Sequence, residues 1–173
     1  MKRFILGLVA ATAIALFAGR AEAKVIALYA SGQGGVQTMG QSTPGLGVEL
    51  GARVLILDAY VDYTAFSSTE SISRGIFGVR GGIGSRDFRL VLRAGVGGIH
   101  EDGGALTGPL GAPARTGGVA RAGASFEGRL NKLTYLGFGV DGETYRFADN
   151  SFGIATEGSD IFAAMRLTFE LGI

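Results

Sequence analysis

The positions of the charged residues constrain this chain more than any other feature of its sequence. From residue 44 onward, several segments alternate polar and apolar residues with a period of two, which is typical of β-strands with two unlike faces. Leu, Val, Ala and Phe hold one parity, and charged residues share the other with many of the 31 glycines. Seven arginines and seven carboxylates follow this rule, namely Glu49, Arg53, Asp58, Asp62, Arg80, Arg89, Arg93, Arg121, Glu127, Arg129, Asp141, Glu143, Arg166 and Glu170. The alternation predicts a sheet with one charged face and one apolar face.

Eight segments of this kind follow residue 23, and none of them has the 3.6-residue apolar period of a helix. The predicted strands cover residues 24–34, 44–54, 56–67, 73–84, 87–100, 115–129, 132–147 and 159–173. The first strand is apolar on both parities, so the pattern does not assign its faces. Arg146 departs from the rule, and we expect it to lie beyond the apolar zone near the end of its strand.

The predicted connections alternate in length. Tight turns are expected near Leu55, at 84–86 and at Asn131. Between them come four longer loops rich in Gly, Ser, Thr, Pro and acids, over residues 35–43, 68–72, 101–114 and 148–158. This alternation indicates an antiparallel meander with its long loops at one end. Eight such strands can close into an all-β, up-and-down barrel, and closure leaves no exposed sheet edge.

Three features favour a transmembrane barrel, whose apolar face meets lipid, over a soluble barrel, whose charged face meets water. Glycines on the charged parity leave room for large side chains in a narrow lumen. The cations of that parity are all arginine, whose planar guanidinium suits paired burial better than a strongly hydrated lysine does. Seven cations also balance seven anions, as a buried network requires. A secreted soluble barrel that carries an apolar ligand remains the alternative.

The N-terminal segment predicts export. Met1-Lys2-Arg3 is a basic opening, residues 4–18 form an apolar run, and Ala21-Glu22-Ala23 fits a cleavage site. The expected organisation is a cleavable signal peptide at 1–23 and a barrel at 24–173. The chain has no cysteine, which excludes disulfides and thiolate metal sites, and its formal net charge of +1 without a basic run argues against nucleic acid as a partner.

Together, the leader, the eight alternating strands and a last strand with Leu167, Phe169, Leu171 and Ile173 on one parity resemble the small outer-membrane β-barrels, such as the OmpA transmembrane domain and OmpX-like proteins. The resemblance implies the outer membrane of a Gram-negative cell, with the short turns toward the periplasm and the long loops outside. It implies a role in envelope structure or surface interaction, with outer-membrane lipid or lipopolysaccharide as the expected partner. Aromatic girdles at the two interfaces are expected from Tyr29, Tyr63, Phe66, Phe77, Phe88 and Tyr135.

The charged face is best interpreted as a structural network that plugs the lumen of a non-enzymatic protein, without cofactor or metal. A gate, in which Arg166, Glu170, Glu49 and Arg53 exchange partners, is the alternative for this set. Surface partners are expected at the four loops.

His100 is the only histidine, and we expect a solvated side chain beside Glu101 and Asp102. A lipid A-modifying enzyme that uses this histidine remains a further alternative, because such a hydrolase needs a serine within reach of a histidine base. The candidate serines, Ser67, Ser68, Ser71 and Ser151, lie in or beside other predicted loops.

Overall fold

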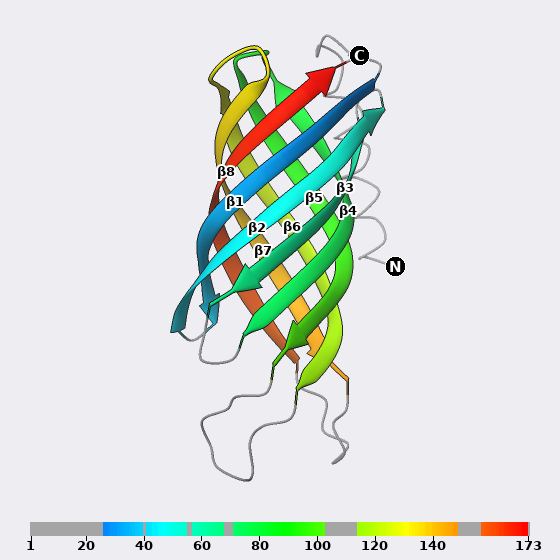
Figure 1. Cartoon of the computed structure of the whole chain (residues 1–173), viewed down its shortest axis with the longest axis vertical. Coiled ribbons are helices and arrows are strands. Elements are labelled where there is room, and N and C mark those ends of the chain that lie inside the picture. Colours follow the sequence, from blue (N-terminus) through cyan, green and yellow to red (C-terminus); the bar gives the residue numbers. More distant parts are fainter. Residues whose placement is uncertain are drawn as a thin grey trace, which may run out of the picture.

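The computed structural model describes residues 26–39, 41–54, 57–67, 71–102, 114–148 and 157–172; the predicted signal peptide lies outside these ranges. The chain forms a closed barrel of eight antiparallel strands in sequence order, as the alternation predicted (Figure 1). The strands are β1 (Ile26–Met39), β2 (Gln41–Val54), β3 (Leu57–Phe66), β4 (Ile72–Gly84), β5 (Phe88–Glu101), β6 (Arg115–Arg129), β7 (Thr134–Phe147) and β8 (Glu157–Gly172).

Register determines how far the strands tilt. Each strand pairs with its sequence neighbours, and β1 also pairs with β8. Moving across the strands from partner to partner, the path that starts at Ala27 returns to β1 at Gln37, ten residues further along. Eight strands with a stagger of this size tilt by about 40° and enclose a space that side chains just fill.

The two ends of the barrel differ in the connections between strands. Strands β2, β4, β6 and β8 all finish at one end (top of Figure 1), which we call the turn end; the opposite end is the loop end. Between β4 and β5, Gly84 takes a φ of 144°, and the Ser85 hydroxyl accepts a hydrogen bond from the Phe88 backbone amide at 3.1 Å. Between β6 and β7, the Asn131 side chain accepts the Leu133 amide at 2.9 Å.

The predicted loop at 35–43 is wrong. β1 continues to Met39 and β2 starts at Gln41, and the two strands stay paired through this region, for example Gln37 with Thr43. Gln37 is fully buried in the barrel. Glycine and uncharged polar residues suit a solvated loop, but here Gly35 and Gln37 line the interior while Thr38 and Ser42 face outward, so composition alone did not distinguish loop from strand. The other predicted strands agree with the structure to within two residues at each end.

Alternate residues face inward and outward on every strand, and β3 alternates without exception over Leu57–Phe66. The outward side chains are mainly Leu, Val, Ile, Phe and Ala. On β8 the outward apolar run from Ile161 to Leu171 covers ten residue steps, which is about 33 Å along the strand and about 25 Å along the barrel axis. That height equals the apolar band of transmembrane barrels.

The predicted aromatic girdle is only half present. Tyr63, Phe77 and Phe88 face outward and are more than half exposed, whereas Tyr29 and Phe66 are buried inside the barrel. Tyr135 is buried inside as well. These three aromatic rings stack with interior arginines, so the prediction failed because burial of a ring against a guanidinium outweighed placement at the interface.

Inward glycines make room for the large side chains beside them. A Cβ at Gly51 would overlap the Tyr29 ring, and one at Gly139 would overlap the Arg166 guanidinium. A Cβ at Gly78 would overlap the Ala94 carbonyl oxygen and lie 2.7 Å from the Tyr60 ring. Inside the barrel, large side chains therefore lie next to glycines, which have no side chain to clash with them.

Two glycines on β4 give a matched test of this packing. Gly78 faces inward, whereas a Cβ at the outward-facing Gly75 meets nothing within 4 Å. Gly78→Ala is expected to destabilise the folded barrel by about 1–3 kcal/mol because it overpacks the interior. Gly75→Ala is expected to be neutral or slightly stabilising, since alanine restricts the unfolded chain. Urea titration of the refolded protein measures both. Equal destabilisation would contradict the packing argument.

Candidate functional site

The candidate site is the barrel interior, where charged side chains from seven strands converge. Within the described residues, hydrogen bonds and ion pairs connect seven arginines with eight carboxylates. They are Arg53, Arg74, Arg80, Arg89, Arg93, Arg121 and Arg166, with Glu49, Asp58, Asp62, Glu127, Asp141, Glu143, Asp160 and Glu170. β1 contributes Gln33 and Gln37.

At the turn end, two carboxylates each bridge two arginines. Glu170 accepts from Arg53 at 2.9 Å and from Arg89 at 2.8 Å. Asp58 accepts from the Arg53 Nε at 2.6 Å and from the Arg80 Nε at 2.9 Å. Each carboxylate thus connects strands on both of its sides through charge-assisted hydrogen bonds.

The same arrangement repeats in the middle of the barrel. The two oxygens of Glu49 accept from Arg80 and Arg93, each at 3.0 Å. Asp141 lies 3.5 Å from the Arg93 Nε and accepts from Arg166 at 2.5 Å. All five side chains are buried. A carboxylate between two guanidiniums is the arrangement that offsets the desolvation of all three groups.

The side chain of Gln33 connects two groups of ion pairs in the barrel interior. The Gln33 carbonyl accepts from the Arg166 Nε at 3.1 Å, and its amide nitrogen donates to Asp62. Arg121 then donates to Asp62 at 2.8 Å and to Glu143 at 2.6 Å. Gln33, from the uncharged strand β1, therefore joins the Arg166–Asp141 pair of the middle to the Asp62–Arg121 pair on the loop side, and with them the two halves of the network.

The loop-side half ends at Arg74 and Asp160. Arg74 donates to Glu143 and, at 3.2 Å, to Asp160, which also accepts from Gln37 at 2.5 Å. Beyond this layer, Arg115 donates to Glu101 at 2.6 Å. The charges thus continue from one end of the barrel to the other.

Rings cover the faces of four interior guanidiniums. The Arg80 carbon lies 3.4 Å from the centre of the Tyr29 ring, and the Arg89 carbon lies 4.0 Å from the Tyr135 ring. The remaining two contacts are Arg74 over Phe66, at 4.5 Å, and Arg115 over Phe147, at 4.6 Å. Cation–π contacts of this kind stabilise the flat faces of the guanidinium that hydrogen bonds do not reach.

An apolar cluster fills much of the interior near the loop end. Buried Ile99, Val119 and Phe147 pack together, and Phe66 meets Phe162 edge to face at 5.3 Å. Ile72 packs against both groups. The cluster therefore packs beside the loop-side charges, where the centre of the Phe66 ring also lies 4.5 Å from the Arg74 guanidinium carbon.

Thirteen of the fourteen predicted network residues join this network. Arg129 does not join the network: its Nε donates to the Asn131 carbonyl at 2.8 Å, because the last residue of β6 lies beside a turn that offers that acceptor. The pattern missed Arg74 and Asp160. Both hold the charged parity of their strands, so extending the alternation toward the loop end of each strand identifies them.

The four residues of the gate alternative are only partly brought together. Arg53 and Glu170 form an ion pair at 2.9 Å. Glu49 pairs with Arg80 and Arg93, and Arg166 pairs with Asp141. An exchange of partners among the four would have to break these other pairs first.

His100 lies outside this network, on the outer face of the barrel. Its Nε2 is 3.0 Å from an Asp102 carboxylate oxygen, and both side chains are exposed. Ser73 on β4 is the register partner of His100 and faces the same side. The sequence pattern did not indicate this serine, because only register brings it opposite His100. Ser68 and Ser151 lie outside the described residues.

Over the part of the chain that the structure describes, no group of His, Asp and Glu side chains is arranged to hold a metal ion. Likewise, none of the described segments forms a helix long and apolar enough to cross a membrane.

Glu49 and Glu157 provide a matched test of the interior charges. Glu49→Gln leaves Arg80 and Arg93 buried without their shared carboxylate, so we expect a loss of about 3–5 kcal/mol in the free energy of unfolding. Glu157→Gln removes the same charge from an exposed pair with Arg146, 3.5 Å apart, and is expected to cost less than about 1 kcal/mol. Urea-induced unfolding compares them; a Glu49 variant as stable as the Glu157 variant would refute the network.

No protein-family model matches the sequence, and no curated protein matches it. Solved structures do match. The N-terminal β-barrel domain of Pseudomonas aeruginosa OprF aligns with a TM-score of 0.66 and 11% identity over 84% of this chain and 97% of that one. Neisserial surface protein A gives 0.66 and 10% over 86% and 99%. Ail of Yersinia pestis gives 0.50 and 8% over 84% and 98%. The chain therefore has the fold of the small eight-stranded outer-membrane β-barrels.

Proposed function

We propose that this protein is an integral outer-membrane β-barrel whose interior network plugs the lumen, with a structural or surface-interaction role in the envelope. The observation that carries the proposal is the contrast between the two faces of the sheet. In the described strands, the outward positions of the apolar belt hold no charged residue, and Arg146 and Glu157 lie beyond it, toward the loop end. Inward positions hold the paired charges.

Physical chemistry supports lipid as the surroundings of this belt. Leu46, Phe77 and Val96 are each more than 60% exposed, within an apolar surface that encircles the barrel. Soluble monomers rarely expose a contiguous apolar patch larger than a few hundred Å². A soluble carrier of an apolar ligand needs the reverse arrangement, with an apolar interior. We therefore prefer the membrane proposal to the soluble carrier.

The filled interior supports a structural role rather than a pore. Bridging carboxylates, stacked rings and the apolar cluster occupy the lumen. Surface interaction would fall to the loops, and we retain residues 68–72, 101–114 and 148–158 as candidates; most of them lie outside the described residues. Another barrel of this fold, Ail, was crystallised with the heparin analogue sucrose octasulfate.

Fractionation tests the membrane proposal. We expect the chain to sediment with the outer membrane, to need detergent for extraction, and to migrate faster on gels when unheated, because the folded barrel resists detergent. In planar bilayers the wild-type protein should conduct little, since its lumen is filled. Recovery from the periplasm without detergent would refute the proposal, and a large stable conductance would refute the plug. A small porin refolded in the same bilayers serves as the conducting control.

One observation favours a second candidate, hydrolysis of an acyl ester at the outer face. Register places Ser73 opposite His100, and such cross-strand pairs hold their Cβ atoms about 5 Å apart. Asp102 bonds to the Nε2 of His100, which leaves Nδ1 to accept the serine proton. The acyl group would pass to the Ser73 Oγ while the alcohol of the ester leaves with the proton that His100 took from Ser73. Water would then hydrolyse the acyl-serine, releasing a fatty acid and returning the proton to Ser73.

A fluorophosphonate probe tests this candidate in the refolded protein. The probe should label wild-type protein, and labelling should fall at least about tenfold in Ser73→Ala and His100→Gln, because the serine alone is a weak nucleophile. Ser159→Ala, an outward serine on β8, is the matched control and should label normally. Equal labelling of all four proteins, or of none, would exclude the hydrolase and leave the structural role as it stands.

A further inference from the structure

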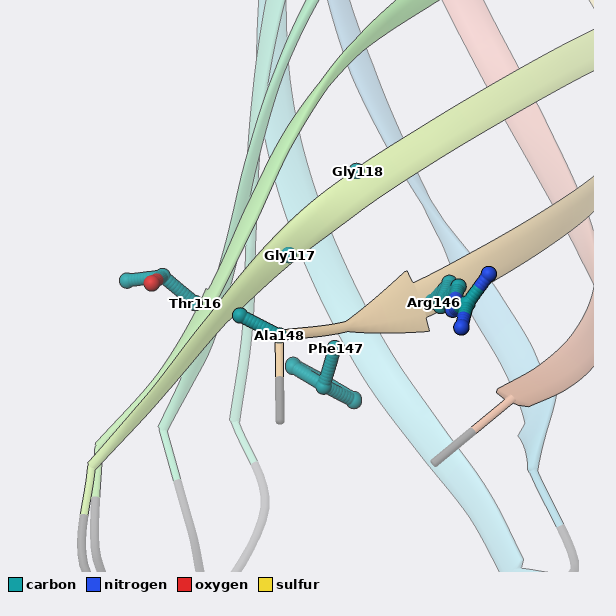
Figure 2. A pocket seen from close by; sticks show the side chains of 6 residues that line it. All are labelled: Thr116, Gly117, Gly118, Arg146, Phe147 and Ala148. Carbon is teal, nitrogen blue, oxygen red and sulfur yellow. The ribbon is translucent and has the colours of Figure 1, made fainter. Parts of the chain in front are cut away.

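A depression of about 500 Å³ lies at the loop end of β6 and β7, outside the network. Its lining comes from residues 116–118 and 146–148. Figure 2 shows the Arg146 side chain on β7 beside the bare β6 ribbon at Gly117 and Gly118. The side chain of Arg146 is 68% exposed. It is the one arginine on the outer face of the described strands, so at the loop end of these strands this depression is the place where a cation borders the apolar belt.

The floor of the depression continues across two more strands. Arg146 is the register partner of Gly118, Gly118 of Gly98, and Gly98 of Gly75. All four residues face outward. We call the row Gly75, Gly98 and Gly118 the glycine furrow. With Arg146 at its end, it covers three strand spacings, or about 14 Å.

Packing within the protein does not require these glycines. A Cβ at Gly75 or Gly118 meets nothing within 4 Å, and one at Gly98 meets only the Gly117 carbonyl oxygen, at 3.8 Å. Most inward glycines are the opposite case, since a Cβ at Gly51, Gly78 or Gly139 overlaps neighbouring atoms. Glycine inside a strand weakens it and often marks a close approach of another molecule to the backbone. Packing within the chain therefore does not explain the row of glycines that makes up the furrow.

The furrow follows the border of the apolar belt. On its belt side the adjacent outward residues are Phe77, Val96 and Ala120; on its loop side they are Ser73, His100 and Thr116. A molecule in the furrow would touch apolar side chains along one edge and hydroxyl or imidazole groups along the other. This is the environment of a lipid headgroup where it joins its acyl chains.

We propose that the depression and the furrow bind the headgroup of an anionic, phosphate-bearing membrane lipid, with the phosphate on Arg146. The proposal rests on the membrane placement argued above. An arginine fork binds two phosphate oxygens at once, and the acyl chains of the lipid would descend past Val96 and Ala120.

Glu157 is the group that opposes the phosphate. It lies 3.5 Å from the Arg146 Nε, and its side chain is 69% exposed. Exposed pairs of this kind are weak and exchange readily, so a lipid phosphate can displace the carboxylate. Removing the carboxylate should therefore strengthen lipid binding, an outcome that a purely structural role for the pair does not predict.

Native mass spectrometry of the full chain in detergent micelles, titrated with dioleoylphosphatidic acid, tests the proposal. Arg146→Gln should weaken binding about tenfold, because a charge-assisted hydrogen bond is lost. Gly98→Leu should also weaken it by filling the furrow, and Glu157→Gln should strengthen it. Dioleoylglycerol, which lacks the phosphate, should bind to none of the proteins.

The controls make the same two kinds of change, loss of a cation and filling of an outward glycine, elsewhere on the barrel. Lys132→Gln takes a cation from the turn end, and Gly32→Leu fills an outward glycine on β1 where a Cβ also meets nothing within 4 Å. Both should bind phosphatidic acid as the wild type does. Equal weakening in Lys132→Gln and Arg146→Gln, or dimers without bound lipid, would overturn the lipid site. A chain that stays monomeric in buffer without detergent would instead refute the membrane proposal itself.

Discussion

The pairing of buried charges inside a narrow barrel is the requirement on which the rest of the structure depends. A buried charge without a partner costs several kcal/mol, and an eight-stranded lumen has room only for side chains. Each guanidinium must therefore meet carboxylates from other strands. Glu49 on β2 accepts from arginines on β4 and β5, and Asp62 on β3 accepts from Arg121 on β6. Because these strands are not neighbours in the sheet, the network holds the cross-section of the barrel together in a way that the backbone ladder does not.

The two faces of the sheet follow from the same requirement. Large charged and aromatic side chains fit inside only because glycines stand beside them, as Gly51 does for the Tyr29 ring and Gly139 for Arg166. With the polar groups turned inward and paired, the outward positions are left to Leu, Val, Phe and Ala. An apolar belt of about 25 Å is then the natural consequence of a filled polar lumen, and it agrees with the thickness that a membrane barrel needs.

The sequence pattern predicted the closed eight-stranded barrel because parity and chemistry are local properties of a strand. It failed where the interior is polar without being charged. Gly35 and Gln37 read as loop residues although they extend β1 inside the barrel. It also missed Arg74 at a strand end and included Arg129, whose acceptor is a turn carbonyl. These errors share a cause, since the chemistry of a strand end depends on what the neighbouring strand or turn offers.

Register and the ten-residue stagger determine which side chains meet across strands. The alternation within a single strand predicts neither of them. The pairing of Ser73 with His100 and the row from Gly75 to Arg146 emerge only once the strands are aligned. Inside the barrel, the fold itself accounts for its glycines and its charges. At the loop-side border of the outer face it does not, because bare backbone and polar side chains gather there without a packing reason. The lipid contact proposed above would account for that border, which directs tests of interaction to the outer rim and not to the lumen.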